Sequence, residues 1–140
     1  MPLFRNEIYY CDHIGAFDCD YSDIERFSVK DERGNGLVQY LKYSAQEDES
    51  AGRMRTYLVR TNNTDLAGYF SLKAGLISLN ESNNAGYNEF DTLPGIELAN
   101  FAVNNEYQAR HPETKGLGLM IFKRLKPRYD SECIFMYQRL

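Results

Sequence analysis

The sequence has few residues of the kinds that bind metal ions or form disulfide bonds. Only three of its 140 residues are cysteines, Cys11, Cys19 and Cys133, and only His13 and His111 are histidines. Zinc sites need closely spaced pairs such as C-x-x-C, and no such pair is present. We therefore predict no metal site and three reduced thiols that pack as small apolar side chains.

Long apolar runs are also missing. No stretch approaches the roughly 20 apolar residues that span a bilayer, and residues 1–25 contain no sustained apolar run after a basic start. These absences predict a cytoplasmic protein without a membrane segment. The net charge of -4 argues against a broad nucleic-acid surface, because phosphate binding depends on clustered Lys and Arg.

The hydrophobic content of 43% is enough for one core, and we expect a single domain over residues 1–140. Apolar residues recur at helical spacing from Gly36 to Glu49, which predicts an amphipathic helix. β-branched and aromatic residues in 56–59 and 66–72, on either side of a turn sequence, predict an antiparallel hairpin. Its second strand is expected to continue to Leu79 past a bulge or bend at Gly75.

The second half begins with a polar segment, Asn80 to Asn88, which predicts an exposed loop. The largely apolar run Ile96 to Val103 predicts a central strand that is covered on both faces. A polar loop, Asn104 to Lys115, then leads into a short helix that we expect to end at Pro127. A final strand is predicted from Cys133 to Tyr137.

The start of this helix has the residues of a phosphate-binding turn. Gly116-Leu117-Gly118 follows a buried strand and a polar loop, so backbone N–H groups and the helix N-terminus could meet an anion. A glycine pair at an ordinary turn is the alternative interpretation. The Walker and dinucleotide patterns are excluded, because the first needs G-K-[ST] and the second a third glycine.

The segments GIELANFAVNNEYQ and KGLGLMIF resemble the GNAT superfamily of acyl-coenzyme A dependent N-acyltransferases. The upstream stretch from Gly36, which ends in G-Y-F-S-L, is similar to that family's helix and strand pair, so the resemblance spans roughly residues 25 to 125. It implies an α/β (α+β) fold with a mixed, mainly antiparallel sheet flanked by helices. It also implies acetyl-CoA as the cofactor.

The resemblance assigns a role to each half of the motif. On the strand, backbone groups would bind the pantetheine arm of the cofactor, and in the turn they would hold the pyrophosphate. The strand residues are Phe101, Ala102 and Val103, and the turn residues are Lys115, Gly116, Leu117, Gly118 and Leu119.

Two further residues of the strand are candidates for the chemistry. Glu97 stands where several family members keep a general base for the acceptor amine, and an ordinary paired carboxylate is the alternative. Asn100 is a candidate for substrate binding or for polarising a carbonyl, and it could equally satisfy neighbouring backbone groups.

The sequence departs from the family after the helix. Family members continue with another strand, a helix that commonly carries a tyrosine acid, and two closing strands, whereas this C-terminal half is abbreviated. The ending resembles the last strand of related proteins, so the missing strand would leave the cofactor site half built. We expect a second chain, or the last strand itself, to cover Ile96 to Val103. Tyr129 and Tyr137 are the remaining candidate acids, and Glu113 replaces a residue that would favour phosphate.

These features favour an N-acetyltransferase that moves acetyl from acetyl-CoA to a primary amine, of a small molecule or a protein, by direct attack. One alternative is a catalytically silent remnant that binds the cofactor or a partner, within a possible homodimer. Another is a toxin that acetylates aminoacyl-tRNA, the one interpretation that would involve nucleic acid.

Overall fold

The computed structural model describes residues 4–5, 8–16, 22–78, 92–114, 116–130 and 134–137. In these residues six strands form one sheet in the order β1-β2-β3-β4-β5-β6. The first four pairings are antiparallel and the last, between β5 and β6, is parallel. The mixed, mainly antiparallel sheet is therefore confirmed. The strands are β1 (Phe4–Arg5), β2 (Tyr9–His13), β3 (Arg55–Thr61), β4 (Leu66–Ser78), β5 (Thr92–Val103) and β6 (Ile134–Tyr137).

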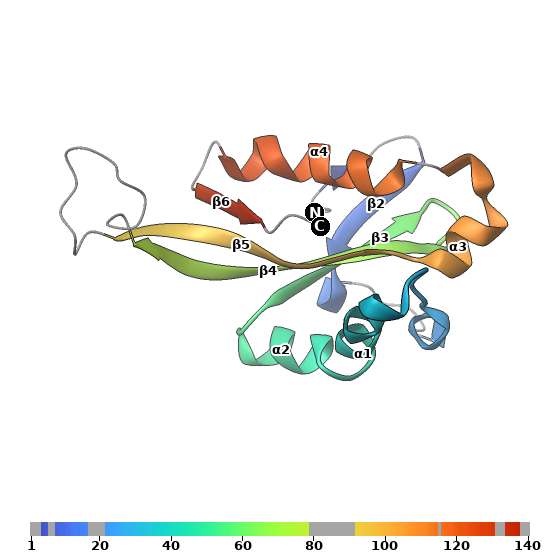
Figure 1. Ribbon diagram of the computed structural model, residues 1–140, viewed down its shortest axis with the longest axis horizontal. Helices are drawn as coiled ribbons and strands as arrows, with labels where there is room; N and C mark the ends of the chain where they lie inside the picture. Colours follow the sequence, from blue (N-terminus) through green and yellow to red (C-terminus); the bar gives the residue numbers. More distant parts are fainter. Residues whose placement is uncertain are drawn as a thin grey trace.

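Helices cover both faces of the sheet (Figure 1). On one face lie α1 (Asn35–Tyr43) and α2 (Ala45–Ala51), and on the other lies α4 (Leu117–Asp130). Between β5 and α4 the chain forms α3 (Asn105–Arg110). Single turns of 3-10 helix complete the described elements: η1 (Ile14–Ala16), η2 (Ser22–Arg26), η3 (Glu32–Gly34) and η5 (Pro112–Thr114).

Each face of the sheet has its own apolar core, because successive strand residues point to opposite faces. Phe70 packs in the core under α4, whereas its neighbour Tyr69 packs in the core over α1 and α2. Gly68 allows β4 and β5 to approach closely, since a Cβ there would lie 2.8 Å from the Ala102 carbonyl oxygen. The predicted hairpin is confirmed: its first strand is longer than the sequence indicated, and its second strand runs to Ser78, one residue short of the expected Leu79.

The helix predicted from Gly36 to Glu49 is present but broken. Ser44 has φ -123°, which is not helical, and it separates α1 from α2. The second helix then ends at Gly52, whose φ of 72° lies in the left-handed region that glycine adopts at low cost.

The expected bulge at Gly75 was wrong, because Gly75 pairs regularly with Gly95. The irregularity lies instead where Ser71 pairs with Asn100 and Leu72 pairs with Leu98, which leaves Ala99 as the extra residue of β5. From this extra residue onward, the order in which the side chains of β5 point to one face of the sheet or the other is shifted by one residue. As a result Leu98 and Phe101, three positions apart, both face the core under α4.

The segment after β5 also differs from the prediction. The expected polar loop from Asn104 to Lys115 contains α3 and η5. Asn104 caps α3, because its side-chain oxygen accepts the Glu106 N–H at 3.2 Å. The following helix does not end at Pro127 but runs to Asp130, so proline removes only one backbone hydrogen bond of the last turn.

The strand expected to be missing is supplied by β6. It follows α4 directly and pairs in parallel with Gly95 to Leu98 of β5, which makes a β-α-β unit. The last strand thus lies alongside the candidate cofactor strand, which is one of the two arrangements that the sequence led us to expect. Its pairing with β5 is parallel because the chain returns through α4 to the same end of the sheet.

Several sequence predictions lie outside the described residues, among them the loop Asn80 to Asn88 and the cysteines at positions 19 and 133. Cys11 is a buried free thiol, as predicted. Within the described part, no helix is long and apolar enough to span a membrane, and no three metal-binding side chains cluster.

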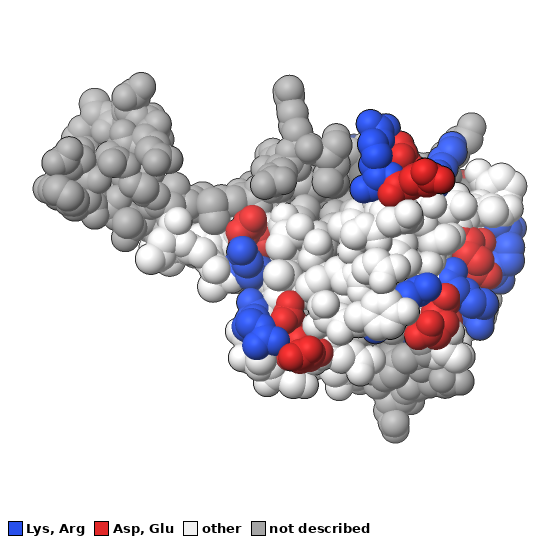
Figure 2. Space-filling model, turned by 60° about the horizontal axis from the view of Figure 1, so that its bottom comes forward, with Lys and Arg blue, Asp and Glu red and all other residues white. Residues whose placement is uncertain are grey.

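Charged side chains of both signs lie side by side on the face of α1 and α2 (Figure 2). Ion pairs account for part of this pattern: Arg53 with Asp48 at 2.8 Å, Arg55 with Glu49 at 3.4 Å, and Lys73 with Glu97 at 3.5 Å. Basic residues of this face are therefore balanced locally by carboxylates.

Candidate functional site

The C-terminal part of β5 has one edge that no described strand covers, called here the open edge. Since β6 pairs only with Gly95 to Leu98, no described strand lies beside the residues from Ala99 to Val103 on that side. The Asn104 N–H donates to the Ala67 carbonyl at 2.8 Å, so the backbone groups of Asn104 point toward β4. Along a strand, successive residues point their backbone N–H and C=O groups alternately toward one neighbouring strand and the other. The backbone N–H and C=O groups of Phe101 and Val103 consequently face the open edge.

Ala102 differs from its two neighbours. It pairs with Tyr69, and the same alternation turns its backbone groups toward β4. Its side chain is buried against α1 and α2, whereas those of Phe101 and Val103 pack under α4. Of the three strand residues predicted to bind pantetheine, Phe101 and Val103 are the two whose backbone groups are available at the edge.

The beginning of α4 lies against these two residues. A Cβ on Gly118 would be 3.4 Å from Phe101 Cε1 and 3.4 Å from Val103 Cγ2, an ordinary van der Waals contact, so the start of the helix packs directly against the strand. Gly116 has φ 86°, a left-handed conformation that suits glycine, and its carbonyl accepts the Met120 N–H at 2.9 Å. The open edge and a helix N-terminus are thus brought together.

The first N–H groups of an α-helix have no acceptor within the helix. In α4 these belong to Leu117, Gly118 and Leu119, and the helix dipole adds partial positive charge there. The Leu117 side chain is buried under the helix and that of Leu119 is exposed. Lys115, the remaining residue predicted to hold pyrophosphate, lies outside the described residues.

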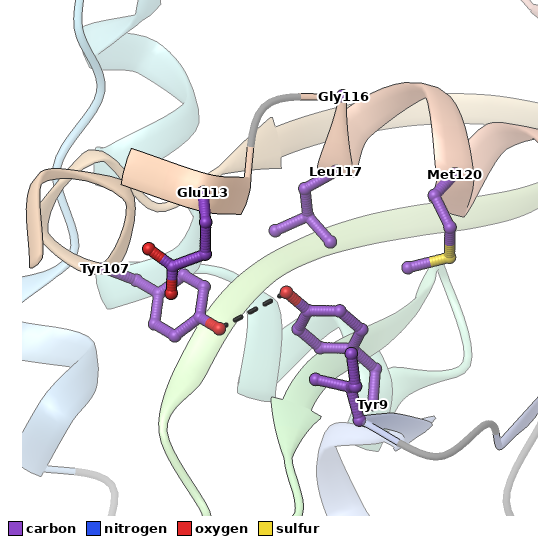
Figure 3. A pocket seen from close by; sticks show the side chains of 7 residues that line it. Tyr9, Tyr107, Glu113, Gly116, Leu117 and Met120 are labelled. Carbon is purple, nitrogen blue, oxygen red and sulfur yellow. Dashed lines mark hydrogen bonds between the residues drawn. The ribbon is translucent and has the colours of Figure 1, made fainter. Parts of the chain in front are cut away.

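A cavity of about 290 Å³ lies on the other side of this turn, between β2 and α4 (Figure 3). Its floor is formed by Tyr9 and Tyr107, whose hydroxyl oxygens are 3.2 Å apart. Burial raises the pKa of Tyr107, so its phenol stays protonated. The Glu113 carboxylate faces Tyr107 here and pairs with His111 at 3.3 Å, so its negative charge lies on the β2 side of the turn.

Glu97 and Asn100 lie on the face of the sheet that carries α1 and α2. Glu97 Oε2 is 3.5 Å from Lys73 Nζ on the neighbouring strand, with the glutamate about one-third exposed. The side-chain nitrogen of Asn100 is 3.7 Å from the Met54 sulfur, which also accepts the Tyr40 hydroxyl at 3.2 Å. Sequence reasoning missed Lys73 and Met54, because neither has a local pattern that marks it.

The two candidate acids are not brought into this arrangement by any described contact. Tyr137 is the last residue of β6 and pairs with Leu98 through the backbone. The side chains of Tyr137 and Tyr129 lie outside the described residues.

Comparison by sequence finds no family model and no curated protein that matches the chain. Comparison by structure finds bacterial toxins. A Tyr-to-Phe mutant of the toxin AtaT, bound to the C-terminus of the antitoxin AtaR and acetyl-CoA, superposes with TM-score 0.65 and 17% identity, over 94% of this chain and 75% of AtaT. A mutant of the toxin KacT superposes with TM-score 0.67 and 18% identity, over 95% and 79%. AtaT complexed with acetyl-methionyl-tRNAfMet gives TM-score 0.62 and 15% identity, over 88% and 69%.

The chain has the GNAT fold. This confirms the resemblance seen in the sequence at the level of fold. In this GNAT fold the open edge of β5 and the start of α4 are the two parts of the predicted cofactor site, and β6 forms the adjoining strand.

Proposed function

We propose that the protein is an N-acetyltransferase that transfers acetyl from acetyl-CoA to a primary amine by direct attack. The observation that carries the proposal is the adjacency of two sets of backbone donors without a partner in the described part of the chain, those of Phe101 and Val103 at the open edge and those that begin α4. An extended amide-bearing chain with a pyrophosphate at one end matches both sets.

The residues present fit this group. Phe101 and Val103 offer N–H and C=O groups to the amides of the pantetheine arm, as a neighbouring strand would. The start of α4 packs against the same edge at Gly118, so the first N–H groups of the helix can hold the pyrophosphate. When bound, the cofactor supplies a thioester whose carbonyl carbon accepts a nucleophile.

On the acceptor side we propose Glu97 as the general base and Asn100 as a substrate-binding residue. Glu97 would take the proton that the amine loses when its nitrogen bonds to the acetyl carbon. Bound acetyl-CoA would supply the acetyl group, and coenzyme A would leave as a thiol whose proton comes from an acid or from solvent. Asn100 presents its amide nitrogen to Met54, which leaves the amide oxygen to accept a hydrogen bond from the amine.

Two measurements test this proposal. Calorimetric titration of coenzyme A should show a saturable 1:1 complex, and thiol release from acetyl-CoA should appear when mixed amine acceptors are added. Binding without turnover would favour the silent remnant that binds cofactor. Absence of any coenzyme A binding would overturn the proposal.

A toxin that acetylates aminoacyl-tRNA is the second candidate. It is favoured by the fold comparisons, since AtaT has been solved with acetyl-methionyl-tRNAfMet. The balanced charge on the face of α1 and α2 is an objection, because tRNA binding needs a net basic surface. Growth arrest on expression, with acetylated charged tRNA recovered from the cells, would support this candidate. Normal growth with no acetylated tRNA would exclude it.

A homodimer also remains a proposal. The last strand already covers Gly95 to Leu98, which removes one reason for a second chain, while the edge beyond Leu98 is left for a ligand or a partner. Light scattering measures the mass of the protein in solution with and without coenzyme A, and this distinguishes a ligand from a second chain at this edge.

A further inference from the structure

A second cavity opens on the acceptor side of the sheet, beside the residues proposed to act on the amine. It measures about 190 Å³ and lies between the end of α2 and the exposed parts of β3 and β4. Met54 forms one wall and also contacts Asn100, and Lys73 forms another and also contacts Glu97. The cavity therefore adjoins both candidate residues of β5.

The lining of the cavity contains three cationic side chains, Arg53 and Arg55, which are two residues apart, and Lys73 on β4, together with the carboxylate of Glu49. Each cation also pairs with a carboxylate of the same face, so an anionic ligand would bind through the donors that these pairs leave available. Glu49 is held by other partners, since Oε1 lies 3.0 Å from His13 Nδ1 and Oε2 accepts the Thr56 N–H at 3.2 Å. Its charge is thus shared with groups outside the cavity.

The three cations retain donors for a ligand. Arg55 uses its Nε for Glu49, Arg53 uses Nε for Asp48 and Nη2 for Glu47, and Lys73 pairs with Glu97, which leaves further N–H groups on each cation. All three side chains are between 43% and 58% exposed, so an anion can reach them from solvent. Arginine in particular binds carboxylate and phosphate in a two-pronged geometry.

We propose that this cavity binds an anionic group, a carboxylate or a phosphate, carried by the acceptor amine. This inference rests on the proposed acetyl transfer and names the class of acceptor: an amine with an acidic group nearby, such as an amino acid. The anion would compete with Glu97 for Lys73. Binding of the correct acceptor would therefore release the Glu97 carboxylate from its ion pair next to the amine that must lose a proton.

The test compares acceptors that differ only in the acidic group. Phenylalanine and phenethylamine share the amine and the ring, and O-phosphoethanolamine and ethanolamine form the matching phosphate pair. Each is titrated by calorimetry into the protein saturated with coenzyme A. We expect the acidic member of at least one pair to bind about tenfold tighter or more, as for one charge-assisted hydrogen bond. The pair that shows the difference identifies carboxylate or phosphate as the anion.

The variants Arg55→Gln and Lys73→Met should remove this preference by weakening the acidic member alone. Arg110→Gln is the matched control, because Arg110 also pairs with a glutamate but lies on α3, away from the cavity. In steady-state assays the same loss should appear in KM for the acidic acceptor. Equal or absent binding of both members of each pair overturns the inference.

Failure of the proposed acetyl transfer can be distinguished from failure of the anion site. If coenzyme A does not bind, the same titrations into the free protein still report on the cavity. A preference for acidic ligands without coenzyme A binding would keep the anion site and reject acetyl transfer. Coenzyme A binding without a preference for acidic ligands would keep acetyl transfer and reject the anion site.

Discussion

Gly118 at the start of α4 lies directly against Phe101 of β5, with 3.4 Å between the ring carbon Cε1 and the position that a Cβ would take. Replacing Gly118 with valine should push the helix away from the open edge, because a branched side chain needs more room than this contact leaves. We expect coenzyme A affinity to fall by about tenfold or more, a free-energy loss of about 1.4 kcal/mol, measured by calorimetry.

A control separates this effect from a general cost of replacing glycine in a helix. At Gly36 in α1 a Cβ would have no neighbouring atom within 4 Å, so Gly36→Ala should leave coenzyme A affinity unchanged. It should raise the free energy of unfolding by up to about 1 kcal/mol, because alanine favours helix. Wild-type affinity in Gly118→Val would contradict the cofactor assignment for this turn.

Gly68→Ala should destabilise the sheet. Its methyl group would lie 2.8 Å from the Ala102 carbonyl oxygen, a backbone atom that cannot move aside without distorting β5. We expect a loss of about 1–3 kcal/mol in the free energy of unfolding, measured in urea. An unfolding midpoint equal to that of wild type would show that the two strands are not held this closely.

Glu97→Gln should lower kcat by about 10² to 10⁴-fold, because it removes the proposed base and keeps the shape of the side chain. Coenzyme A affinity should stay the same, since the carboxylate lies on the opposite face of the sheet from α4. Stopped assays of thiol release from neutral to alkaline pH measure the effect. An unchanged rate over that range would leave Glu97 as an ordinary partner of Lys73.

Asp48 predicts how stability depends on pH. Hydrogen bonds from Arg53 and from the Tyr40 hydroxyl lower the pKa of its carboxyl below the ordinary value of 3.8. The folded state therefore binds the proton more weakly than the unfolded state does. The stabilisation is present above the unfolded pKa and is lost as the pH falls through the lower folded pKa.

Asp48→Asn should consequently be less stable than wild type near neutral pH, and the difference should shrink as the pH falls below about 4. Urea unfolding of both proteins between neutral pH and pH 3 measures it. A difference that stays constant over this range would mean that the ion pair with Arg53 adds nothing beyond packing.

The sequence by itself determined most of the local elements and suggested the candidate cofactor motif. Alternating and helical apolar patterns identified the hairpin, the long strand, the helical segment of α1 and α2, and α4, because these patterns follow from backbone geometry alone. The short helix α3 was missed because its segment is mostly polar. The glycines at 116 and 118 identified the turn, and Gly116 has the left-handed conformation that few other residues adopt.

Tertiary structure decided what these elements face. The extra residue at Ala99 reverses which side chains of β5 point toward α4, and no local pattern shows an insertion of one residue. The position of β6 likewise depends on the return through α4 and not on the strand's own composition. The pairing of Lys73 with Glu97, and the cavity that Lys73 shares with Arg53 and Arg55, exist only because separate strands align in register. Register is set by packing across the whole sheet, which is why the sequence alone could name candidate residues for the cofactor and the acceptor but not the side chains that lie beside them.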